Sequence, residues 1–433
     1  MESVQNKIVK AALLGAGTVG SGVYELVKER QEDFPHICGT QIEIAKILVR
    51  DASKEREGIP SELLTDNWEE IIADDSISII IEVMGGIEPA KSYLLEAMKA
   101  GKQVVTANKD LIAEHGHELL DTAEQYGCDF KFEAAVAGCV PIIQILKQSM
   151  SSENITEIMG IVNGTTNYIL TRMTQSGLSY DEALKEATDL GYAEADPTAD
   201  VDGLDAGRKI AIMASIAFHS RVTFSDVYIE GIRNITAKDI FYAKEFNSVI
   251  KLVGIARKDE NGIEVKVLPI LIPQEHPLAT VNDSYNAVFV HGDAVEDAMF
   301  FGRGAGELPT ASAVVGDVFD IVRNILAGCC GRIGCTCYKN IPVKKMEDTH
   351  NRYFLRLKVE DRCGVLAEMT AIFAKYQVSV AQIIQKDTKV EGCAEVVVIT
   401  EKVREGDFRT AIEELRNRDS VRKISTIIRV YGK

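Results

Sequence analysis

The sequence lacks a long hydrophobic run, an excess of positive charge and a secretory signal. No apolar run approaches the roughly 20 residues that a membrane-spanning helix needs. The N-terminal segment MESVQNKIVKAALLGAG is too polar before its apolar run to be a signal peptide. The formal net charge of −17 argues against a nucleic-acid partner, because phosphate binding needs a basic surface. We therefore expect a cytoplasmic protein with neither a membrane nor a nucleic-acid partner.

The composition is that of an ordinary globular protein, and its 433 residues suffice for two or three domains. Its nine cysteines are expected to be reduced in the cytoplasm. Four of them crowd into the segment NILAGCCGRIGCTCYKN: Cys329, Cys330, Cys335 and Cys337. The spacings C-C and C-x-C do not match a two-pair zinc ribbon. We expect small reduced residues in a linker over residues 329–350, with a metal or redox role as the alternative.

The N-terminal segment IVKAALLGAGTVGSGVYELVKER is an apolar run followed by a glycine-rich turn and a helical pattern. Gly15 and Gly17 allow a tight turn and a close approach of the backbone to a pyrophosphate, and Gly20 lets the helix pack closely on the strand. The helix N-terminus adds partial positive charge. A glycine-rich structural turn is the alternative. The context predicts a dinucleotide site that includes Thr18 and Val19.

Further apolar runs predict more strands of the same sheet. They cover residues 42–50, 78–86, 102–109 and 129–138. Helical patterns separate the later runs; one is PAKSYLLEAMKAG, which ends at Gly101. Alternating strands and helices predict a doubly wound, Rossmann-type α/β domain over residues 1–138.

The end of the second predicted strand bears on the choice of coenzyme. In an NAD-selective domain this strand usually ends in an acidic residue that binds the ribose hydroxyl. Here it ends in Arg50, with Asp51 and Lys54 following. Arg50 and Lys54 could hold a 2′-phosphate, whereas Asp51 would oppose one. NADPH is favoured over NADH, and a surface arginine at a strand end is the alternative for Arg50.

An acidic segment, GYAEADPTADVDGLDAGRK, leads into a predicted helix that bears Lys209. Its carboxylates are Glu194, Asp196, Asp200, Asp202 and Asp205. Clustered carboxylates repel one another, and a substrate amine, a metal or a lysine would account for their proximity. Asp205 and Lys209 are spaced to share one helix face. A solvated acidic loop with an ordinary helical ion pair is the alternative.

Six motifs in order resemble homoserine dehydrogenase. They are GAGTVGSG, TANKDLIA, EAAVAGCVPII, NGTTNYIL, the acidic segment and GRGAGELPTASAVVGD. The resemblance implies reversible NAD(P)-dependent reduction of L-aspartate 4-semialdehyde to L-homoserine, on the pathway to threonine and methionine. It also implies a substrate-binding and dimerisation domain over residues 139–308. A helix at about 309–328 would complete the first domain, with Gly306 approaching the nucleotide.

The same resemblance implies the residues that bind and protonate the substrate. Glu194 would bind the substrate ammonium beside Asp200, with Thr165 and Tyr192 as supporting hydrogen-bonding groups. Lys209 would protonate the alkoxide.

Lys109 would reach the same site, and Asp205 would orient Lys209. Two lysines this close are expected to lower each other's pKa, which favours proton transfer near neutrality.

The segment EAAVAGCVP resembles the family's site for a monovalent cation such as sodium. The resemblance implies Glu133, Val136, Gly138 and Val140 as its lining, mostly through backbone carbonyls, in a structural role. From the sequence alone, a plain exit from strand to loop is the alternative.

The last part of the chain, residues 351–433, has a strand and helix order of βαββαβ, which predicts a ferredoxin-like unit. Its opening, VEDRCGVLAEMTAIFAKYQVSV, resembles an ACT domain, a small regulatory module that binds amino acids. Cys363 stands where the family often has proline. The resemblance implies a threonine effector near Asp361, Gly364 and Leu366, in a homodimer or homotetramer. A module used only for assembly is the alternative.

Two other functions compete with a homoserine dehydrogenase. A nucleotide-binding domain joined to an ACT module would also make a non-enzymatic metabolite sensor. A dehydrogenase for another amino-acid aldehyde is the second alternative. Lys209 together with Glu194 and Lys109 favours an enzyme, because a sensor would not need them.

Overall fold

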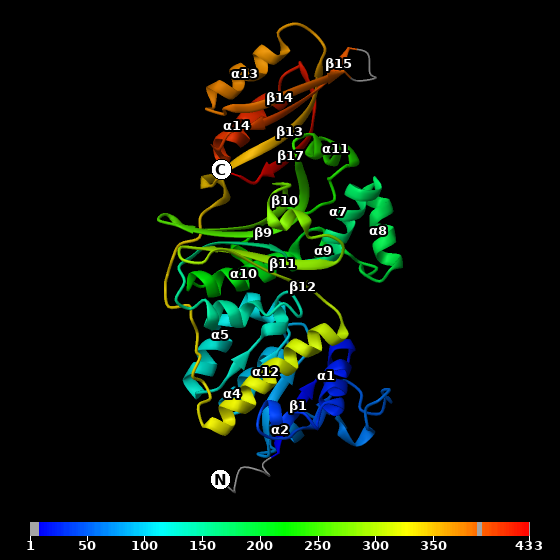
Figure 1. Ribbon diagram of the computed structural model, residues 1–433, viewed down its shortest axis with the longest axis vertical. Helices are drawn as coiled ribbons and strands as arrows, with labels where there is room; N and C mark the ends of the chain where they lie inside the picture. Colours follow the sequence, from blue (N-terminus) through cyan, green and yellow to red (C-terminus); the bar gives the residue numbers. More distant parts are fainter. Residues whose placement is uncertain (1–7, 388–391, 433) are drawn as a thin grey trace.

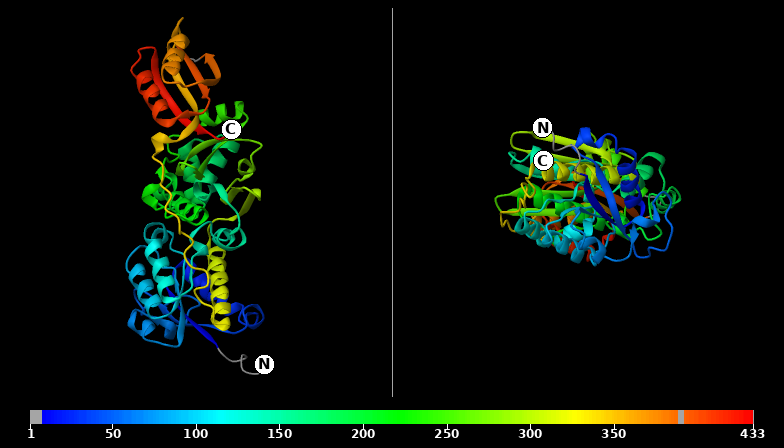
Figure 2. Two further views of the ribbon diagram at one scale, coloured as in Figure 1. Left: turned by 90° about the vertical axis from the view of Figure 1, so that its left-hand side faces the viewer. Right: turned by 90° about the horizontal axis from the view of Figure 1, so that it is seen from below.

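The chain forms three parts stacked along one long axis (Figure 1). A computed structural model describes residues 8–387 and 392–432, so residues 1–7 and 388–391 and Lys433 of the predicted domains lie outside the description. The N-terminal domain lies at one end, a central domain in the middle and the C-terminal tail at the other end, and the turned view shows the same arrangement (Figure 2). Among the described residues, no helix has the length and apolar character to cross a membrane.

Six parallel strands form the N-terminal sheet, in the order β3-β2-β1-β4-β5-β6. They are β1 Val9–Leu14, β2 Ile42–Leu48, β3 Leu64–Thr65, β4 Ile77–Glu82, β5 Gln103–Thr106 and β6 Phe130–Lys131. Helices cover both faces: α1 Thr18–Glu29, α2 Phe34–Ile37, α3 Glu69–Ile72, α4 Ala90–Lys99, α5 Lys109–Tyr126 and α12 Glu307–Ala327. In β1, Leu13 packs with α1 and α12 while Leu14 packs with α4 and α5. The predicted Rossmann-type doubly wound sheet is confirmed.

The predicted strand over residues 129–138 is wrong beyond Lys131. The chain leaves the sheet there and forms a 3₁₀ turn at Glu133–Ala135. The Glu133 N–H donates to Asp317 Oδ2 at 2.8 Å, and the Glu133 carboxylate accepts the backbone N–H groups of Ile143 and Gln144, each at 2.7 Å. These bonds replace the strand ladder, and the chain turns again at Gly138, which has φ of +56°.

An antiparallel sheet in the order β12-β11-β7-β9-β10 forms the centre of the molecule. Its strands are β7 Ile155–Ile161, β9 Ser248–Asp259, β10 Gly262–Pro273, β11 Tyr285–Gly292 and β12 Glu296–Arg303, and the two-residue β8 Tyr228–Ile229 pairs with β10. The helices are α6 Ile142–Gln144, α7 Gly164–Ser176, α8 Tyr180–Asp189, α9 Thr198–Val201, α10 Leu204–Phe218 and α11 Ala237–Glu245.

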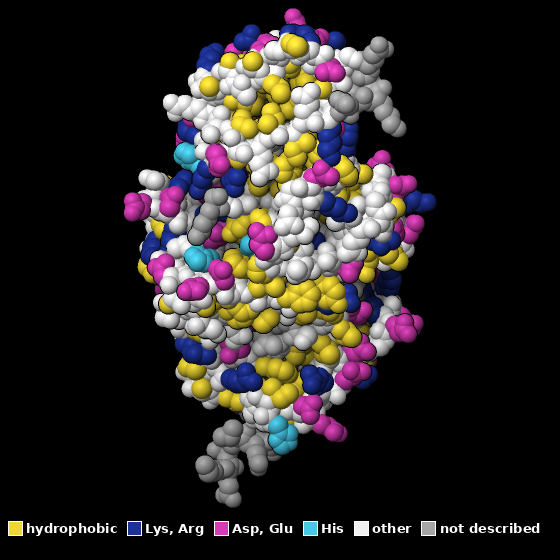
Figure 3. Space-filling view, turned by 45° about the horizontal axis from the view of Figure 1, so that its top comes forward, with side chains coloured by type: hydrophobic (Ala, Val, Ile, Leu, Met, Phe, Trp, Pro, Cys, Tyr) yellow, Lys and Arg dark blue, Asp and Glu magenta, His cyan; other side chains and the backbone are white. Residues whose placement is uncertain are grey.

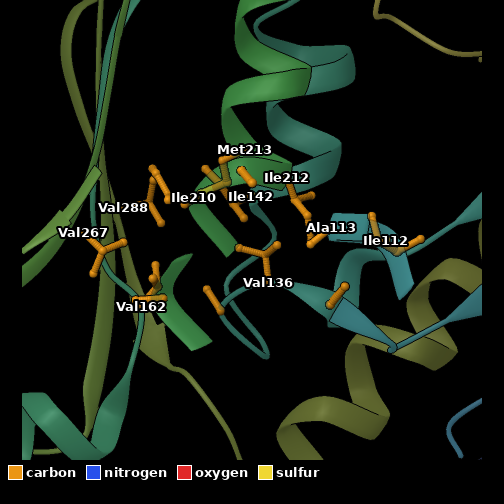
Figure 4. Packing of buried hydrophobic residues seen from close by; sticks show 14 of the residues in the cluster. Ile112, Ala113, Val136, Ile142, Val162, Ile210, Ile212, Met213, Val267 and Val288 are labelled. Atoms are coloured by element: carbon orange, nitrogen blue, oxygen red, sulfur yellow. The ribbon is translucent and has the colours of Figure 1, made fainter. Parts of the chain in front are cut away.

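Helix α10 lies between the central sheet and α5 of the N-terminal domain. Figure 4 shows Ile210 and Met213 of α10 between Val267 and Val288 on the sheet side and Ala113 of α5 on the other. These residues belong to one buried cluster that spans the two domains. The packing brings the N-terminal turns of α5 and α10, which carry the predicted lysines, to one place.

The C-terminal tail has the predicted βαββαβ order. Its elements are β13 His350–Glu360, α13 Val365–Lys375, β14 Val380–Asp387, β15 Cys393–Thr400, α14 Glu405–Arg416 and β17 Val421–Val430, with a two-residue β16 at Val403–Arg404. The tail has a hydrophobic core of its own, built on the inner faces of β13 and β15 and on both helices. The predicted ferredoxin-like fold is confirmed.

The sheet of the tail continues the sheet of the central domain. β17 pairs in parallel with β10, with Ile270 opposite Arg429 and Leu271 opposite Val430. The two sheets thereby join into one of 11 strands. The tail is therefore complete in its own core but shares its edge strand with the central domain.

Candidate active site

The candidate site lies where helices from two domains begin. Asn108 follows β5 and caps α5 by accepting the N–H of Leu111, which places Lys109 in the first turn of that helix. Asn163 follows β7 and caps α7 by accepting the N–H of Thr166. Asp205 lies in the first turn of α10, and its negative charge is favourable at a helix N-terminus.

Asp205 joins the two predicted lysines. Its Oδ2 lies 2.7 Å from the Nζ of Lys209, one turn along α10, and its Oδ1 lies 3.0 Å from the Nζ of Lys109. Lys209 also donates to the backbone carbonyl of Val162 at 2.7 Å. Asp205 and Lys209 are buried, whereas the side chain of Lys109 is 39% exposed. Lys109 is thus the more exposed of the two lysines and Lys209 the more buried.

The sequence analysis missed Asn163, which links the carboxylates. Its Nδ2 donates to Asp200 Oδ1 at 2.6 Å and to Asp205 Oδ2 at 2.9 Å. The signal was available, because Asn163 opens the motif NGTTNY just before α7. A neutral donor between two acids lets both stay close without an additional cation.

Burial and the mixed charges shift the pKa values of this network. Burial tends to raise the pKa of Asp205, but the cations Lys209 and Lys109 and the hydrogen bonds from Asn163 and Lys209 lower it overall. Burial lowers the pKa of Lys209, and Lys109 lowers it further. The pKa of Lys109 is raised, chiefly by Asp205. The expected lowering of the Lys109 pKa is therefore wrong, because Asp205 raises that pKa.

The loop between α8 and α9 carries the remaining predicted substrate residues. Thr165 Oγ1 donates to the carbonyl of Tyr192 at 2.7 Å, which ties this loop to α7. Burial raises the pKa of Asp200, while its hydrogen bond from Asn163 lowers it. Glu194 is exposed, and among the described residues no hydrogen bond or ion pair holds its carboxylate. Asp200 thus contacts the network, whereas Glu194 faces solvent beside it.

A cleft of about 480 Å³ opens at the carboxyl ends of β1, β2 and β4. Gly15, Gly17 and Arg50 line it. A Cβ on Gly20 would lie 2.2 Å from the carbonyl oxygen of Gly15, so only glycine permits this close turn. A Cβ on Gly17 would meet nothing within 4 Å, so its backbone faces open space. The cleft has the size and the glycine-rich wall that a dinucleotide needs.

Two basic side chains near the cleft do not lie as the sequence predicted. Lys54 does not line the cleft, whereas Arg56 does and was missed. Arg56 donates to the carbonyls of Asp51 and Lys54, which folds this loop back toward the cleft. Thr18 and Val19 begin α1, whose N-terminus faces the glycine turn.

Gly306 lies at the start of α12, with φ of +129°, a conformation that favours glycine. The helix it begins packs on α1, and a Cβ on Gly22 would lie 2.9 Å from Cγ of Glu307. Gly306 is therefore near the N-terminus of α1, although it does not line the cleft.

The predicted cation residues lie on one buried turn. Glu133, Val136, Gly138 and Val140 are all buried. A Cβ on Gly138 would lie 2.6 Å from the carbonyl oxygen of Gly304, so this turn packs tightly on the loop before α12. Burial raises the pKa of Glu133, while the backbone N–H groups of Gln144 and Ile143 that its carboxylate accepts lower it. Each of its oxygens retains a lone pair that a cation could use. Among residues 8–387 and 392–432, no group of three or more acidic, histidine or cysteine side chains could hold a metal.

A Rossmann-type cleft beside a buried lysine–carboxylate network defines an NAD(P)-dependent oxidoreductase of the α/β class. Three family models match the chain: "Homoserine dehydrogenase, NAD binding domain" over residues 15–133, "Homoserine dehydrogenase" over 141–319 and "ACT domain" over 353–419. The chain belongs to the homoserine dehydrogenase family.

Two of the similar proteins match nearly the whole chain, and a third matches part of it. The homoserine dehydrogenase of Bacillus subtilis is 44% identical over 430 residues, covering 98% of this chain and 99% of that protein. The crystal structure of a homoserine dehydrogenase from Thiobacillus denitrificans is 38% identical, with a TM-score of 0.92, covering 98% of this chain and 99% of that one. A hyperthermophilic archaeal homoserine dehydrogenase mutant in complex with NADPH is 26% identical, with a TM-score of 0.63, over 72% of this chain and 97% of that one.

Proposed function

We propose that this chain interconverts L-aspartate 4-semialdehyde and L-homoserine, with Lys209 as the group that transfers the proton. The observation that carries the proposal is the buried contact of Lys209 with Asp205. Lys109, from the coenzyme-binding domain, forms a second ion pair with the same carboxylate. The test is a spectrophotometric assay of homoserine-dependent reduction of NADP and of NAD in parallel. Oxidation of a different amino alcohol, with none of homoserine, would favour the alternative of another aldehyde substrate.

The proton step follows from the geometry of Lys209. The nicotinamide coenzyme, when bound, supplies or accepts the hydride. Lys209 is held by the carbonyl of Val162 and by Asp205, which leaves its third N–H free to reach a substrate oxygen. A lowered pKa makes its ammonium a better acid toward an alkoxide. Lys109, whose ammonium is stabilised by Asp205, would bind and orient the substrate rather than exchange its proton.

The substrate ammonium would bind at the acidic loop. Glu194 has a carboxylate without a partner among the described residues, and Asp200 lies next to the network. A charged ammonium between two carboxylates forms strong hydrogen bonds. Thr165 fixes the backbone of Tyr192, so both would act by holding the loop.

The coenzyme would be NADPH, with Arg50 holding the 2′-phosphate. Arg50 lines the cleft at the end of β2, where the ribose of a dinucleotide lies in this fold. Arg56 lines the same cleft and would help, whereas Lys54 would have to rotate toward it. A guanidinium suits a phosphate because it donates two parallel hydrogen bonds.

A monovalent cation such as sodium would bind at the turn of Glu133, Val136, Gly138 and Val140, with a structural role. Support comes from the sharp buried backbone and from the free lone pairs of Glu133. Comparing the thermal unfolding midpoint in sodium and in tetramethylammonium chloride at equal ionic strength tests the site. An equal midpoint in both salts would contradict it.

The tail would bind an amino-acid effector, with threonine as the first candidate. Gly364 begins α13 with φ of +90°, and Asp361 and Leu366 flank it. Leu366 is 37% exposed, and Figure 3 shows exposed hydrophobic side chains gathered over the tail. A second subunit would cover such surface, in a homodimer or homotetramer.

Turnover against threonine concentration tests the effector. If pathway amino acids leave turnover unchanged, the tail serves assembly alone. The archaeal relative matches 72% of this chain with 97% of its own, so part of this chain has no counterpart there. Sedimentation at several protein concentrations gives the subunit number.

A further inference from the structure

Two thiols in the segment before the tail lie in a cleft outside the active site. The linker after α12 runs along the molecule toward the tail (Figure 2), and it carries Cys335 and Cys337, which line a cleft between α5 and α10. Both cysteines are half-buried. The cleft is mainly apolar, with Phe132 and Ile212 in its walls.

Cations surround the pair. Lys147 and Arg221 line the same cleft, together with His117 and one acid, Glu114. Arg221 forms an ion pair with Asp121 at 2.5 Å. Lys147 has no hydrogen bond or ion pair within the described part of the chain; its Nζ lies 5.6 Å above the ring of Phe132. An apolar cleft with an unpaired ammonium favours an anion.

The two sulfurs have different surroundings. Cys335 Sγ accepts the backbone N–H of Cys337 at 3.4 Å, whereas Cys337 Sγ donates to the carbonyl of Ser215 on α10 at 3.4 Å. The backbone N–H of Cys337 and the cations Lys147 and Arg221 lower the pKa of Cys335. The pKa of Cys337 is raised by its interaction with Cys335 and by burial. These surroundings favour the thiolate on Cys335 and the thiol on Cys337.

We propose that Cys335 and Cys337 form a reactive dithiol that exchanges with small anionic disulfides, Cys335 attacking and Cys337 resolving. The Cys335 thiolate attacks one sulfur of a disulfide RSSR; that S–S bond breaks, and RS⁻ leaves and takes a proton from solvent. Cys337 then attacks Cys335 Sγ, and its proton goes to the second departing RS⁻. The products are two RSH and a Cys335–Cys337 disulfide, so RSSR is reduced and the pair oxidised.

Oxidation of the two cysteines would also remove a hydrogen bond to α10. The disulfide has no S–H, so the hydrogen bond from Cys337 to the carbonyl of Ser215 is lost. Ser215 lies on α10, the helix that carries Lys209. Zinc is a poorer explanation for the pair, because the described residues offer no group of three or more ligating side chains.

The test uses the full-length protein with oxidised glutathione as the probe. Trypsin releases Cys335 and Cys337 together in the peptide IGCTCYK, and Cys329 and Cys330 in NILAGCCGR, which serves as an internal control. We expect the first peptide to lose its two thiol hydrogens while the second stays reduced. Cys337→Ser should retain glutathione on Cys335, and Cys335→Ser should retain none on Cys337.

The alkylation rates of single cysteines provide a second test of the proposal. Burial raises the pKa of Cys330 to about 11. Iodoacetamide at neutral pH should therefore label Cys335 on the order of tens of fold faster, because a lower pKa gains more in thiolate than it loses in nucleophilicity. Lys147→Met should slow this labelling, with homoserine oxidation as the check that the variant folds. Equal labelling of Cys335 and Cys330, or glutathione that remains on Cys335 in the wild type, would overturn the proposal.

Discussion

Lys109 and Asp205 form an ion pair of 3.0 Å that crosses from the coenzyme-binding domain to the central domain. Lys109 is the first residue of α5, whereas Asp205 lies in the first turn of α10, which packs on the central sheet. A movement of one domain against the other would break this contact. The electrostatics of Lys209, which shares Asp205, thus depend on how the two domains sit together.

Replacing Lys209 by alanine should reduce turnover by about two to four orders of magnitude, the range for the loss of a general acid. The expected cause is loss of the proton donor, since Asp205 would still have Lys109 as its partner. Turnover with homoserine and coenzyme at saturation is the measurement. Lys185→Ala, on an exposed position of α8, is the matched control and should keep full activity. A folded Lys209→Ala enzyme with near-normal turnover would remove this residue from the mechanism.

The pH dependence of homoserine oxidation should report the pKa of Lys209. Oxidation needs the neutral amine, so turnover should rise with pH through a midpoint below 10.5, the usual lysine value. Lys109→Ala should move this midpoint to higher pH. In this variant the positive charge of Lys109 no longer disfavours the Lys209 ammonium, and the Asp205 carboxylate has Lys209 as its only lysine partner. A midpoint that stays in place or moves down would contradict the assignment.

Arg50→Ala should raise KM for NADPH far more than for NADH. A hydrogen-bonded charged group contributes about 1.5–3 kcal/mol, which corresponds to about a ten- to hundred-fold change. Arg56→Ala should have a similar but smaller effect, because Arg56 is also bonded to the backbone of its own loop. Lys54→Ala is the control beside them, since Lys54 does not line the cleft. Equal losses with both coenzymes would show that Arg50 does not select between them.

The sequence predicted what depends on local spacing and missed what depends on distant contacts. The contact of Asp205 with Lys209 follows from a spacing of one helical turn. The raised pKa of Lys109 did not follow, because it requires knowing that Asp205, far along the chain, lies 3.0 Å from the Lys109 Nζ. The strand expected to reach Gly138 ends at Lys131, because Asp317, far along the chain, takes the N–H of Glu133.

The join between tail and central domain could not be foreseen either. Neither strand has a sequence pattern that would indicate the parallel pairing of β17 with β10. Arg356 of β13 shows how strongly the two parts are coupled: its Nε lies 2.8 Å from Asp239 Oδ1 and its Nη1 3.3 Å from Glu395 Oε1. Asp239 belongs to α11 of the central domain, and the tail supplies the other two residues. A chain that ends near Lys345 would therefore keep its catalytic residues but leave Asp239 without its cation.

Arg356→Ala should lower the free energy of unfolding by about 3–5 kcal/mol, the cost of removing one partner from a buried ion pair. All three side chains are nearly inaccessible, at 7% for Arg356, 0% for Asp239 and 2% for Glu395. Urea unfolding of the full chain is the measurement. Lys358→Ala, two residues along the same strand and exposed, is the control and should change stability little. If Arg356→Ala is as stable as Lys358→Ala, these ion pairs do not hold the tail to the central domain. If threonine inhibits, the same variant should also respond less, because Arg356 is one of the contacts that couple the tail to α11 of the central domain.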